Sequence, residues 1–230
     1  MKKDDIRLFA ARVDFLSETS CFGQAVKFVS NARNEKAARL RRQEDKNLSL
    51  GAELLLRYAL KTVGESGEAP DFSYGENGKP YLQNKRIYFN LSHSGQTVLC
   101  GVSGSELGCD IEKVGPADLK IAKRFFSAAE WETLSCLEPK EQTEEFYRIW
   151  TGKESYLKAL GCGLRFPLSA FTVLPGAEPF SAVMPDGERW YFKTFSSVEG
   201  YACSLCSRAD CGKTQLETAD LKTYLQGVTE

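Results

Sequence analysis

Apolar residues recur along the chain with two different periods, which predict strands and helices in alternation. Alternating or short apolar runs are typical of strands, and apolar positions three or four residues apart are typical of a helix face. In the first half these patterns predict a strand, a long helix, a turn region rich in Gly and Pro, and three further strands, over residues 6–16, 34–63, 64–80, 87–92, 97–103 and 107–112.

The second half repeats this order of elements. Ser127 and Glu130 have the spacing of a capping box, which indicates that a helix begins there. A longer helix and three strands are predicted after it, over residues 141–160, 170–174, 189–195 and 201–207.

Short pieces of sequence recur together with the elements. Two stretches match in residue type, spacing and order: Gly51-Ala-Glu53-Leu-Leu-Leu-Arg57 with Gly152-Lys-Glu154-Ser-Tyr-Leu-Lys158, and Arg86-Ile-Tyr-Phe with Arg189-Trp-Tyr-Phe. Because both matches lie at nearly the same offset, they favour an internal duplication. Aligned on the second match, Asp110 and Glu112 lie opposite Lys213 and Gln215.

The duplication predicts the fold class. We expect an α+β fold of two similar halves, residues 1–112 and 113–230, joined near residues 113–120 and related by a pseudo-twofold axis. Each half has a long helix packed on a small antiparallel sheet, and the two pack as one unit. The functional site is expected in the cleft between them. Since such a chain supplies its own internal interface, we expect a monomer.

Charge and composition exclude several classes of partner. The 230 residues carry 30 Lys and Arg against 31 Asp and Glu, a balance that favours neither nucleic acid nor a membrane surface. The amino terminus lacks the apolar core of a signal peptide, and no stretch is long enough to span a bilayer. We therefore expect a cytoplasmic protein.

The eight cysteines predict buried thiols. Cys100, Cys109, Cys203 and Cys206 lie in apolar runs, which favours the reduced form in a chain without a secretory signal. Cys203 and Cys206 have the spacing of half a zinc site, but a second pair at ligand spacing is missing, and the single histidine is distant in sequence.

Four charged residues have the pattern of a metal and phosphate site. Asp110 and Glu112 alternate along a strand, so their carboxylates face the same side, and Glu154 and Lys158 share one face of a helix. Three carboxylates and an ammonium suit a hard cation, Mg²⁺ or Mn²⁺, that holds a phosphate-bearing substrate. The alternative is a solvated strand end and a surface pair worth about 0.2–0.5 kcal/mol.

Further candidates suit the phosphates of such a substrate. His93 stands between Ser92 and Ser94 where a strand enters a tight turn, which favours a phosphate or ribose contact over a core histidine. Lys79, in the turn Gly78-Lys79-Pro80, could face the same ligand. Arg39, Arg41, Arg42 and Lys46 form a basic helical stretch, which is usually solvated but would also suit a nucleotide-like ligand.

In order, these pieces resemble the motifs of the 4′-phosphopantetheinyl transferases of the larger, duplicated type that serve surfactin-like synthetases. The resemblance covers roughly residues 35–165 and departs from the family where Cys109 stands in place of a β-branched residue. The motifs are Gly78-Lys79-Pro80, Phe89-Asn90-Leu91-Ser92-His93-Ser94, Gly108-Cys109-Asp110-Ile111-Glu112, Phe125-Phe126-Ser127-Ala128-Ala129-Glu130 and Trp150-Thr151-Gly152-Lys153-Glu154-Ser155-Tyr156-Leu157-Lys158.

The resemblance implies transfer of 4′-phosphopantetheine from coenzyme A to a serine of an apo acyl or peptidyl carrier protein, with release of 3′,5′-ADP. Asp110, Glu112 and Glu154 would hold Mg²⁺ with the pyrophosphate. Lys158 would contact a phosphate, and Glu154 would act as the base, directly or through a water. The 3′-phosphoadenosine end would be bound by Ser92 and His93, helped by Lys79 and by Arg39, Arg42 and Lys46.

Two other functions are compatible with single motifs. A catalytically silent coenzyme A or nucleotide sensor would keep the pocket without the chemistry, and a plain interaction protein would use the charged segments as solvated faces. The intact set Asp110, Glu112, Glu154 and Lys158 favours the enzyme. The apolar stretch Ile121–Phe126 is the expected region of carrier recognition, and the identity of the carrier stays open.

Overall fold

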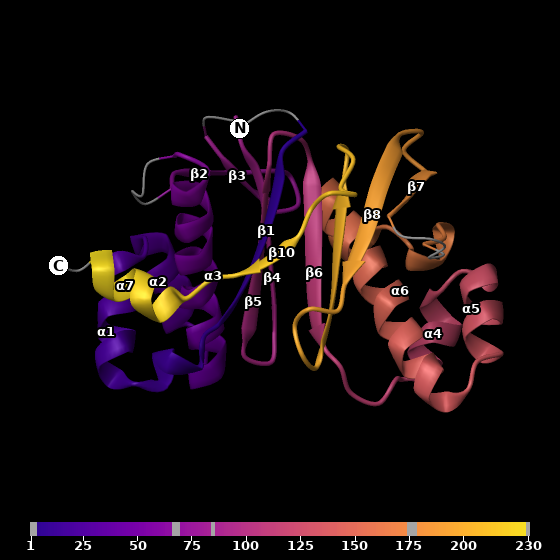
Figure 1. Cartoon of the computed structure of the whole chain (residues 1–230), viewed down its shortest axis with the longest axis horizontal. Helices are drawn as coiled ribbons and strands as arrows, with labels where there is room; N and C mark the ends of the chain where they lie inside the picture. The colour runs from indigo at the N-terminus through magenta and orange to yellow at the C-terminus, as the bar shows by residue number, and fades with distance from the viewer. Residues whose placement is uncertain (1–3, 66–69, 84–85, 174–178, 229–230) are drawn as a thin grey trace.

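Two small sheets lie at the centre of the molecule, with helices on either side of them (Figure 1). The computed structural model describes residues 4–65, 70–83, 86–173 and 179–228. In chain order the first elements are β1 (Ile6–Arg12), α1 (Thr19–Phe28), α2 (Asn31–Ala38), α3 (Gln43–Thr62), β2 (Phe72–Tyr74), β3 (Pro80–Leu82), β4 (Tyr88–Ser94) and β5 (Thr97–Ser103). The later elements are β6 (Leu107–Lys113), α4 (Leu119–Phe125), α5 (Ala128–Ser135), α6 (Pro139–Leu160), β7 (Phe180–Val183), β8 (Arg189–Phe195), β9 (Tyr201–Ser207), β10 (Leu216–Thr218) and α7 (Leu221–Val228).

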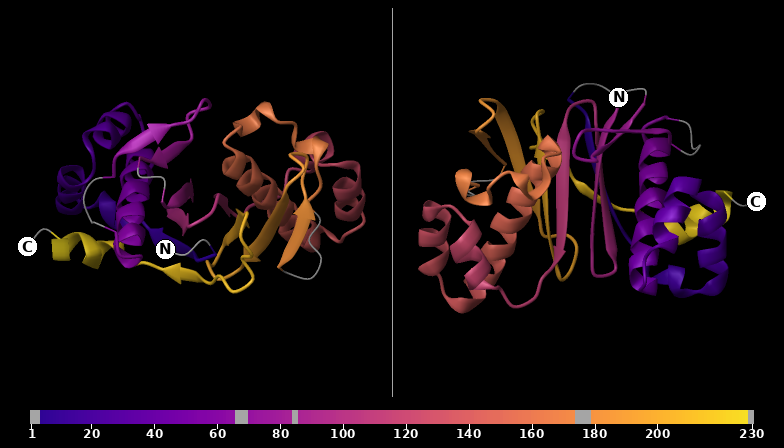
Figure 2. Two further views of the ribbon diagram at one scale, coloured as in Figure 1. Left: turned by 90° about the horizontal axis from the view of Figure 1, so that it is seen from above. Right: turned by 180° about the vertical axis from the view of Figure 1, so that it is seen from behind.

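Strand pairing repeats between the halves and confirms the α+β fold. The first sheet contains β1, β5 and β4 in that order, and the second contains β6, β9 and β8, each pair antiparallel. In both, the long helix, α3 or α6, packs on its sheet. Figure 2 shows the two units from above and behind.

The predicted boundary between the halves at residue 112 assigns β6 to the first half, whereas the strand pairing assigns it to the second sheet. β6 joins the second sheet through β9, and the end of the chain returns to the first half, where β10 pairs in parallel with β1 and α7 contacts α3. β6 takes the place that β1 has in the first sheet, and with the two strands aligned from their first residues Asp110 and Glu112 correspond to Phe9 and Ala11. The expected match with Lys213 and Gln215 is wrong.

Several predicted elements differ in extent. The first strand ends at Arg12, and a short 3-10 turn, Asp14–Ser17, follows it. The predicted helix over 34–63 is two helices, α2 and α3, separated at residues 39–42. Residues 170–173 form no strand, and residue 174 lies outside the described residues. The turn region over 64–80 contains β2 and the start of β3, and its residues 66–69 also lie outside the described part.

One apolar core fills the first half, and another joins the two halves. The first lies between the first sheet and helices α1, α3 and α7, and the second, which contains Leu8, Leu99, Ile111 and Leu205, joins the inner faces of the two sheets. The eight thiols are free, and six of them are buried, including Cys100 and Cys203. No helix in the described residues combines the length and the apolar run that a bilayer crossing requires.

An ion pair with no exposed surface fixes α6 to its surroundings. Lys153 Nζ lies 2.8 Å from Glu130 Oε2 and also donates to the carbonyls of Leu168 and Phe171. Glu130 completes the capping box with Ser127. The pair therefore ties two sequence motifs together, the one that begins α5 and the one that contains Glu154.

We expect Lys153→Met to lower the free energy of unfolding by about 3–5 kcal/mol, because it leaves the buried Glu130 carboxylate without its cation. Urea unfolding followed by circular dichroism measures this. The control is Lys222→Met, which removes the exposed pair with Glu18 and should leave the free energy of unfolding nearly unchanged. Equal losses in the two variants would contradict this account of the buried pair.

Candidate active site

The two halves meet along β4 and β6, and side chains bridge the two strands. The side-chain oxygens of Asn90, Ser92 and Ser94 on β4 accept hydrogen bonds from the backbone N–H groups of Cys109, Ile111 and Lys113 on β6, at 2.9, 3.3 and 3.0 Å. These alternate residues share one side of β4. The bridges therefore set the Ser-His motif beside the Gly-x-Asp-x-Glu motif.

Gly108 allows α6 to lie directly on β6. A Cβ at this position would collide with the backbone of Ser155 and Ala159 on the helix. The close approach brings Glu154 and Lys158 over the face of β6 that carries the two acids. The glycine of this motif is thus required by packing rather than by its backbone conformation.

Asp110 is the most buried acid of the site, with its side chain 3% exposed. Its Oδ1 accepts hydrogen bonds from Lys158 Nζ at 2.5 Å and from Ser92 Oγ at 2.7 Å. Its Oδ2 is buried and has no hydrogen-bond partner among the residues that the structure describes. A buried carboxylate oxygen normally has a partner, so this atom is available for a ligand.

Glu112 lies two residues after Asp110 on β6, so the two side chains are on the same face of the strand. Its Oε2 accepts a hydrogen bond from Ser94 Oγ at 2.8 Å. Burial raises the pKa of Glu112, and the charge of Asp110 raises it further, against the opposing effects of Ser94, Lys158 and Trp150. Trp150 is a site residue whose contact the sequence did not indicate.

Glu154 faces the same group from α6. Burial raises the pKa of this glutamate, and the negative charges of Asp110 and Glu112 raise it further. It lines a cavity of about 250 Å³ together with Lys158, Asn90 and the Gly78-Lys79-Pro80 turn. The structure thus brings together the four charged residues that the sequence singled out.

These residues suit a divalent cation in chemistry. Within the described residues, no three His, Cys, Asp or Glu side chains are arranged as a ready-made metal site. However, a cation would give Oδ2 of Asp110 a partner, and it would offset the neighbouring negative charges that, after burial, raise the pKa of Glu112 and Glu154. Carboxylate oxygens are the ligands that Mg²⁺ and Mn²⁺ prefer.

His93 lies on the other half, among cations. Desolvation lowers the pKa of His93, and the positive charges of Lys158, Lys36 and Arg33 lower it further. Arg33 and Lys36 belong to α2, which the sequence patterns did not separate from α3. The gathering of positive charge around His93 favours an anion there.

The remaining predicted ligands lie in different surroundings. Ser92 is buried, and its hydroxyl is engaged by Asp110 and Lys158. Lys79 directs its ammonium to the carbonyls of Ala159, at 2.5 Å, and Leu107, at 3.4 Å. Arg39 and Arg42 are exposed in the segment between α2 and α3, and Lys46 lies in the first turn of α3, so the expected basic helical stretch is interrupted.

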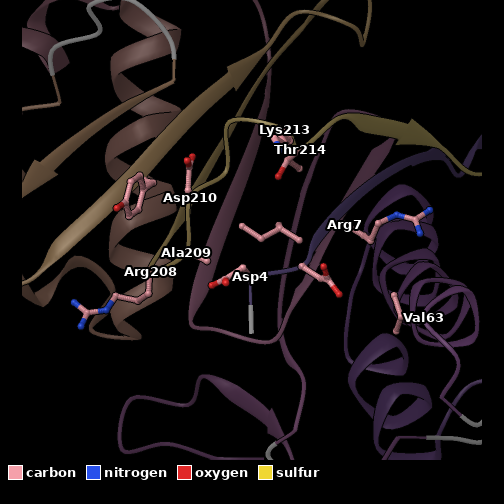
Figure 3. Close-up of a pocket in the computed structure, with 11 residues that line it drawn as sticks. Asp4, Arg7, Val63, Arg208, Ala209, Asp210, Lys213 and Thr214 are labelled. Atoms are coloured by element: carbon pink, nitrogen blue, oxygen red, sulfur yellow. The ribbon is translucent and has the colours of Figure 1, made fainter. Parts of the chain in front are cut away.

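A larger cavity of about 940 Å³ lies elsewhere (Figure 3). Residues from the start of β1, from β8 and from the segment between β9 and β10 line it, among them Arg7, Arg208, Asp210 and Lys213. Arg7 and Arg208 are already paired with Glu217 and Glu188. None of the predicted site residues contributes to its lining.

The fold and the site together define a class of enzyme. One buried and two half-buried acids lie beside a lysine on one half, and a histidine lies among cations on the other. This arrangement is suited to a polyphosphate substrate and a hard cation. Residues 17–104 match the family model of the 4′-phosphopantetheinyl transferase N-terminal domain, and residues 106–206 match that of the 4′-phosphopantetheinyl transferase superfamily. The two matches divide between β5 and β6, in agreement with the strand pairing.

Curated relatives match over most of the chain. A 4′-phosphopantetheinyl transferase of Bacillus subtilis is 38% identical over 183 residues, 78% of this chain and 82% of its own. Sfp of Bacillus subtilis strain 168 is 36% identical over 184 residues with the same coverage, and psf-1 of Bacillus pumilus is 31% identical over 227 residues, 96% and 97% of the two chains. The chain belongs to the 4′-phosphopantetheinyl transferase superfamily, which confirms the resemblance in its motifs.

The environment of Lys79 predicts a pH-dependent stability. Burial lowers the pKa of Lys79 from 10.5 to about 8. The folded chain therefore binds this proton less tightly than the unfolded chain, and the free energy of unfolding rises as pH increases from about 8 toward 10.5. Below pH 8 the group contributes no slope.

We expect the stability of the native protein to rise relative to Lys79→Met between pH 8 and 9.5, at up to about 1.4 kcal/mol per pH unit. Urea unfolding of both proteins at pH 7, 8 and 9.5 measures the difference. Parallel pH profiles would show that Lys79 titrates as an exposed lysine does.

Proposed function

We propose that this chain transfers the 4′-phosphopantetheine group from coenzyme A to a serine of an apo acyl or peptidyl carrier protein and releases 3′,5′-ADP. The observation that carries this proposal is the buried, unpartnered Oδ2 of Asp110 beside Glu112, Glu154 and Lys158. A buried carboxylate that pairs with a lysine through one oxygen and has no partner for the other suits a site in which the substrate or its cation binds the second oxygen.

Asp110, Glu112 and Glu154 would hold Mg²⁺, with Mn²⁺ as a substitute. When bound, the cation supplies charge neutralisation and polarisation at the pyrophosphate. Lys158 contributes its own positive charge at the same place. Burial alone would lower its pKa, but the Asp110 carboxylate outweighs this and raises it, so the ammonium stays charged throughout the neutral range. It is thus fit to stabilise the charge that develops on the phosphate oxygens.

Glu154 is the proposed base. The serine oxygen forms a bond to the β-phosphorus of coenzyme A as the bond to the leaving 3′,5′-ADP oxygen breaks, and the serine proton passes to Glu154, directly or through a water. Burial is the largest cause of its raised pKa and makes it a stronger base than an ordinary glutamate, as proton acceptance requires. The fixed position of α6 on β6 supplies the orientation.

The nucleotide end is assigned to the cations around His93. His93, with Lys36 and Arg33 on α2, would bind the 3′-phosphate, because these groups share one region of positive charge. Arg39, Arg42 and Lys46 extend the basic surface beyond α2 and would add long-range attraction. Lys79 would reach a phosphate by turning from its backbone carbonyls, and Ser92 would act through Asp110 and Lys158.

Carrier recognition is assigned to Ile121–Phe126 on and after α4. Phe125 there is exposed, as is Val114 in the segment before α4, which provides apolar surface near the Glu112 end of β6. We further propose that the protein acts in the cytoplasm as a monomer and that it binds neither nucleic acid nor a membrane. Its balanced charge and the internal pairing of its two halves support these points.

The transfer is tested by mixing the protein, coenzyme A, Mg²⁺ and an apo carrier protein, and measuring the mass of the carrier. We expect the mass of one phosphopantetheine group to be gained, and EDTA to abolish the gain. Binding of coenzyme A without any gain would instead identify a silent sensor, and neither binding nor gain would point to an interaction protein.

Asp110→Ala and Glu154→Gln should each lower kcat by about 100-fold or more, because each removes a group that acts on the reacting phosphate. Steady-state transfer rates and circular dichroism check that the loss is not one of folding. The control is Glu144→Gln, an exposed acid on the same helix, which should transfer normally. Normal turnover by either site variant would remove that residue from the mechanism.

His93→Ala and Lys36→Ala should raise KM for coenzyme A about tenfold and leave kcat within about twofold, because they contact the nucleotide rather than the reacting phosphate. Lys27→Ala, an exposed lysine on α1, is the control. An unchanged KM in His93→Ala would contradict the assignment of the nucleotide end.

A further inference from the structure

At the junction of the two halves, side-chain oxygens of β4 accept the hydrogen bonds that backbone carbonyls would accept in a continuous sheet. β6 is an edge strand of its sheet, and three of its N–H groups point toward β4. An exposed strand edge ordinarily pairs with another backbone or is left to water. Here each acceptor is a side chain, which has further hydrogen-bonding capacity to use.

Ser94 uses that capacity on Glu112. Its Oγ accepts the Lys113 N–H at 3.0 Å and donates its single proton to Glu112 Oε2 at 2.8 Å. A hydroxyl has one proton, so the accepted hydrogen bond on one side directs the donated one to the other. The position of the Glu112 carboxylate is therefore set from the opposite half of the molecule.

Two buried serines at strand ends of the same sheets lack the carboxylate contact that Ser92 and Ser94 make. Ser103, at the end of β5, accepts the N–H of Ser105 at 3.0 Å, and Ser207, at the end of β9, accepts the N–H of Ala209 at 3.1 Å. No carboxylate is among their described partners. Ser103 is thus a natural comparison for a serine whose hydroxyl serves the backbone alone.

We propose that Ser94 is a positioning residue for the divalent-cation site. By holding Glu112 from β4, it couples the affinity for the cation to the correct pairing of the two halves. Ser94 itself touches neither the cation nor the substrate. The inference rests on the proposed function, in which Glu112 is a cation ligand.

The test is the binding of Mn²⁺ to the full chain, measured by electron paramagnetic resonance of free Mn²⁺ in the absence of a carrier protein. Ser94→Ala should weaken Mn²⁺ affinity about tenfold, the effect of one lost hydrogen bond to a charged group. Ser94→Thr keeps the hydroxyl and should bind within about twofold of the native protein. In transfer assays, Ser94→Ala should raise KM for Mg²⁺ and leave kcat at saturating Mg²⁺ nearly unchanged.

Ser103→Ala is the control, because it removes a buried hydroxyl that accepts a backbone N–H and contacts no described carboxylate. It should leave Mn²⁺ affinity unchanged, even where urea unfolding shows that it destabilises the chain as much as Ser94→Ala. Native Mn²⁺ affinity in Ser94→Ala, or equal weakening in Ser103→Ala, would overturn the role of Ser94 and leave the transfer function intact. Absence of Mn²⁺ binding in the native protein would overturn this role and the proposed cation ligands together.

Discussion

The open edge of β6 is the constraint on which the site depends. The N–H groups of Cys109 and Ile111 are buried at the junction of the halves and need acceptors, which Asn90 and Ser92 of β4 provide. At the exposed end of the strand, Ser94 accepts the N–H of Lys113. A plain backbone pairing would have joined the sheets without placing any hydroxyl near Asp110 and Glu112. Because the acceptors are side chains, the hydrogen bonds that join the two halves also involve the hydroxyls that orient Asp110 and Glu112. With Gly108 admitting α6 onto the same strand, that junction brings together residues from three distant parts of the sequence.

The duplicated halves have diverged at matching positions. Where β6 carries Asp110 and Glu112, β1 carries Phe9 and Ala11, so the first half has no acids on its strand. Its helix keeps the pair that matches Glu154 and Lys158, but Glu53 is fully buried and accepts hydrogen bonds from Ser30 N and Ser30 Oγ at 2.6 and 2.8 Å. This fixes the start of α2, the helix that carries Arg33 and Lys36 to His93. One copy of the ancestral pair thus belongs to the candidate site, and the other supports the helix that faces it.

Much of the fold could be predicted from the sequence, for reasons that particular elements make clear. β5, β8 and β9 have the predicted bounds, because apolar runs between turn residues are local signals, and the same is true of the Ser127–Glu130 capping box. The break between α2 and α3 was missed, since charged residues on a helix and in an exposed segment look alike. The return of β10 to β1 and the bridges from β4 to β6 are contacts between distant segments, for which residue type gives no signal. The sequence motifs predict the cluster of acids. They do not predict that Lys36 lies near His93 or that the Ser94 hydroxyl donates to Glu112, and these contacts are known only from the structure.

The central claim is that the junction of two halves places Asp110, Glu112 and Glu154 around one cation. Anomalous diffraction from crystals grown with Mn²⁺ and coenzyme A tests it most directly. The account predicts a single strong Mn²⁺ peak bonded to Asp110 Oδ2 and to carboxylate oxygens of Glu112 and Glu154, with the nucleotide directed toward His93. A peak away from these three acids, or an ordered coenzyme A with no Mn²⁺ beside Asp110, would contradict it.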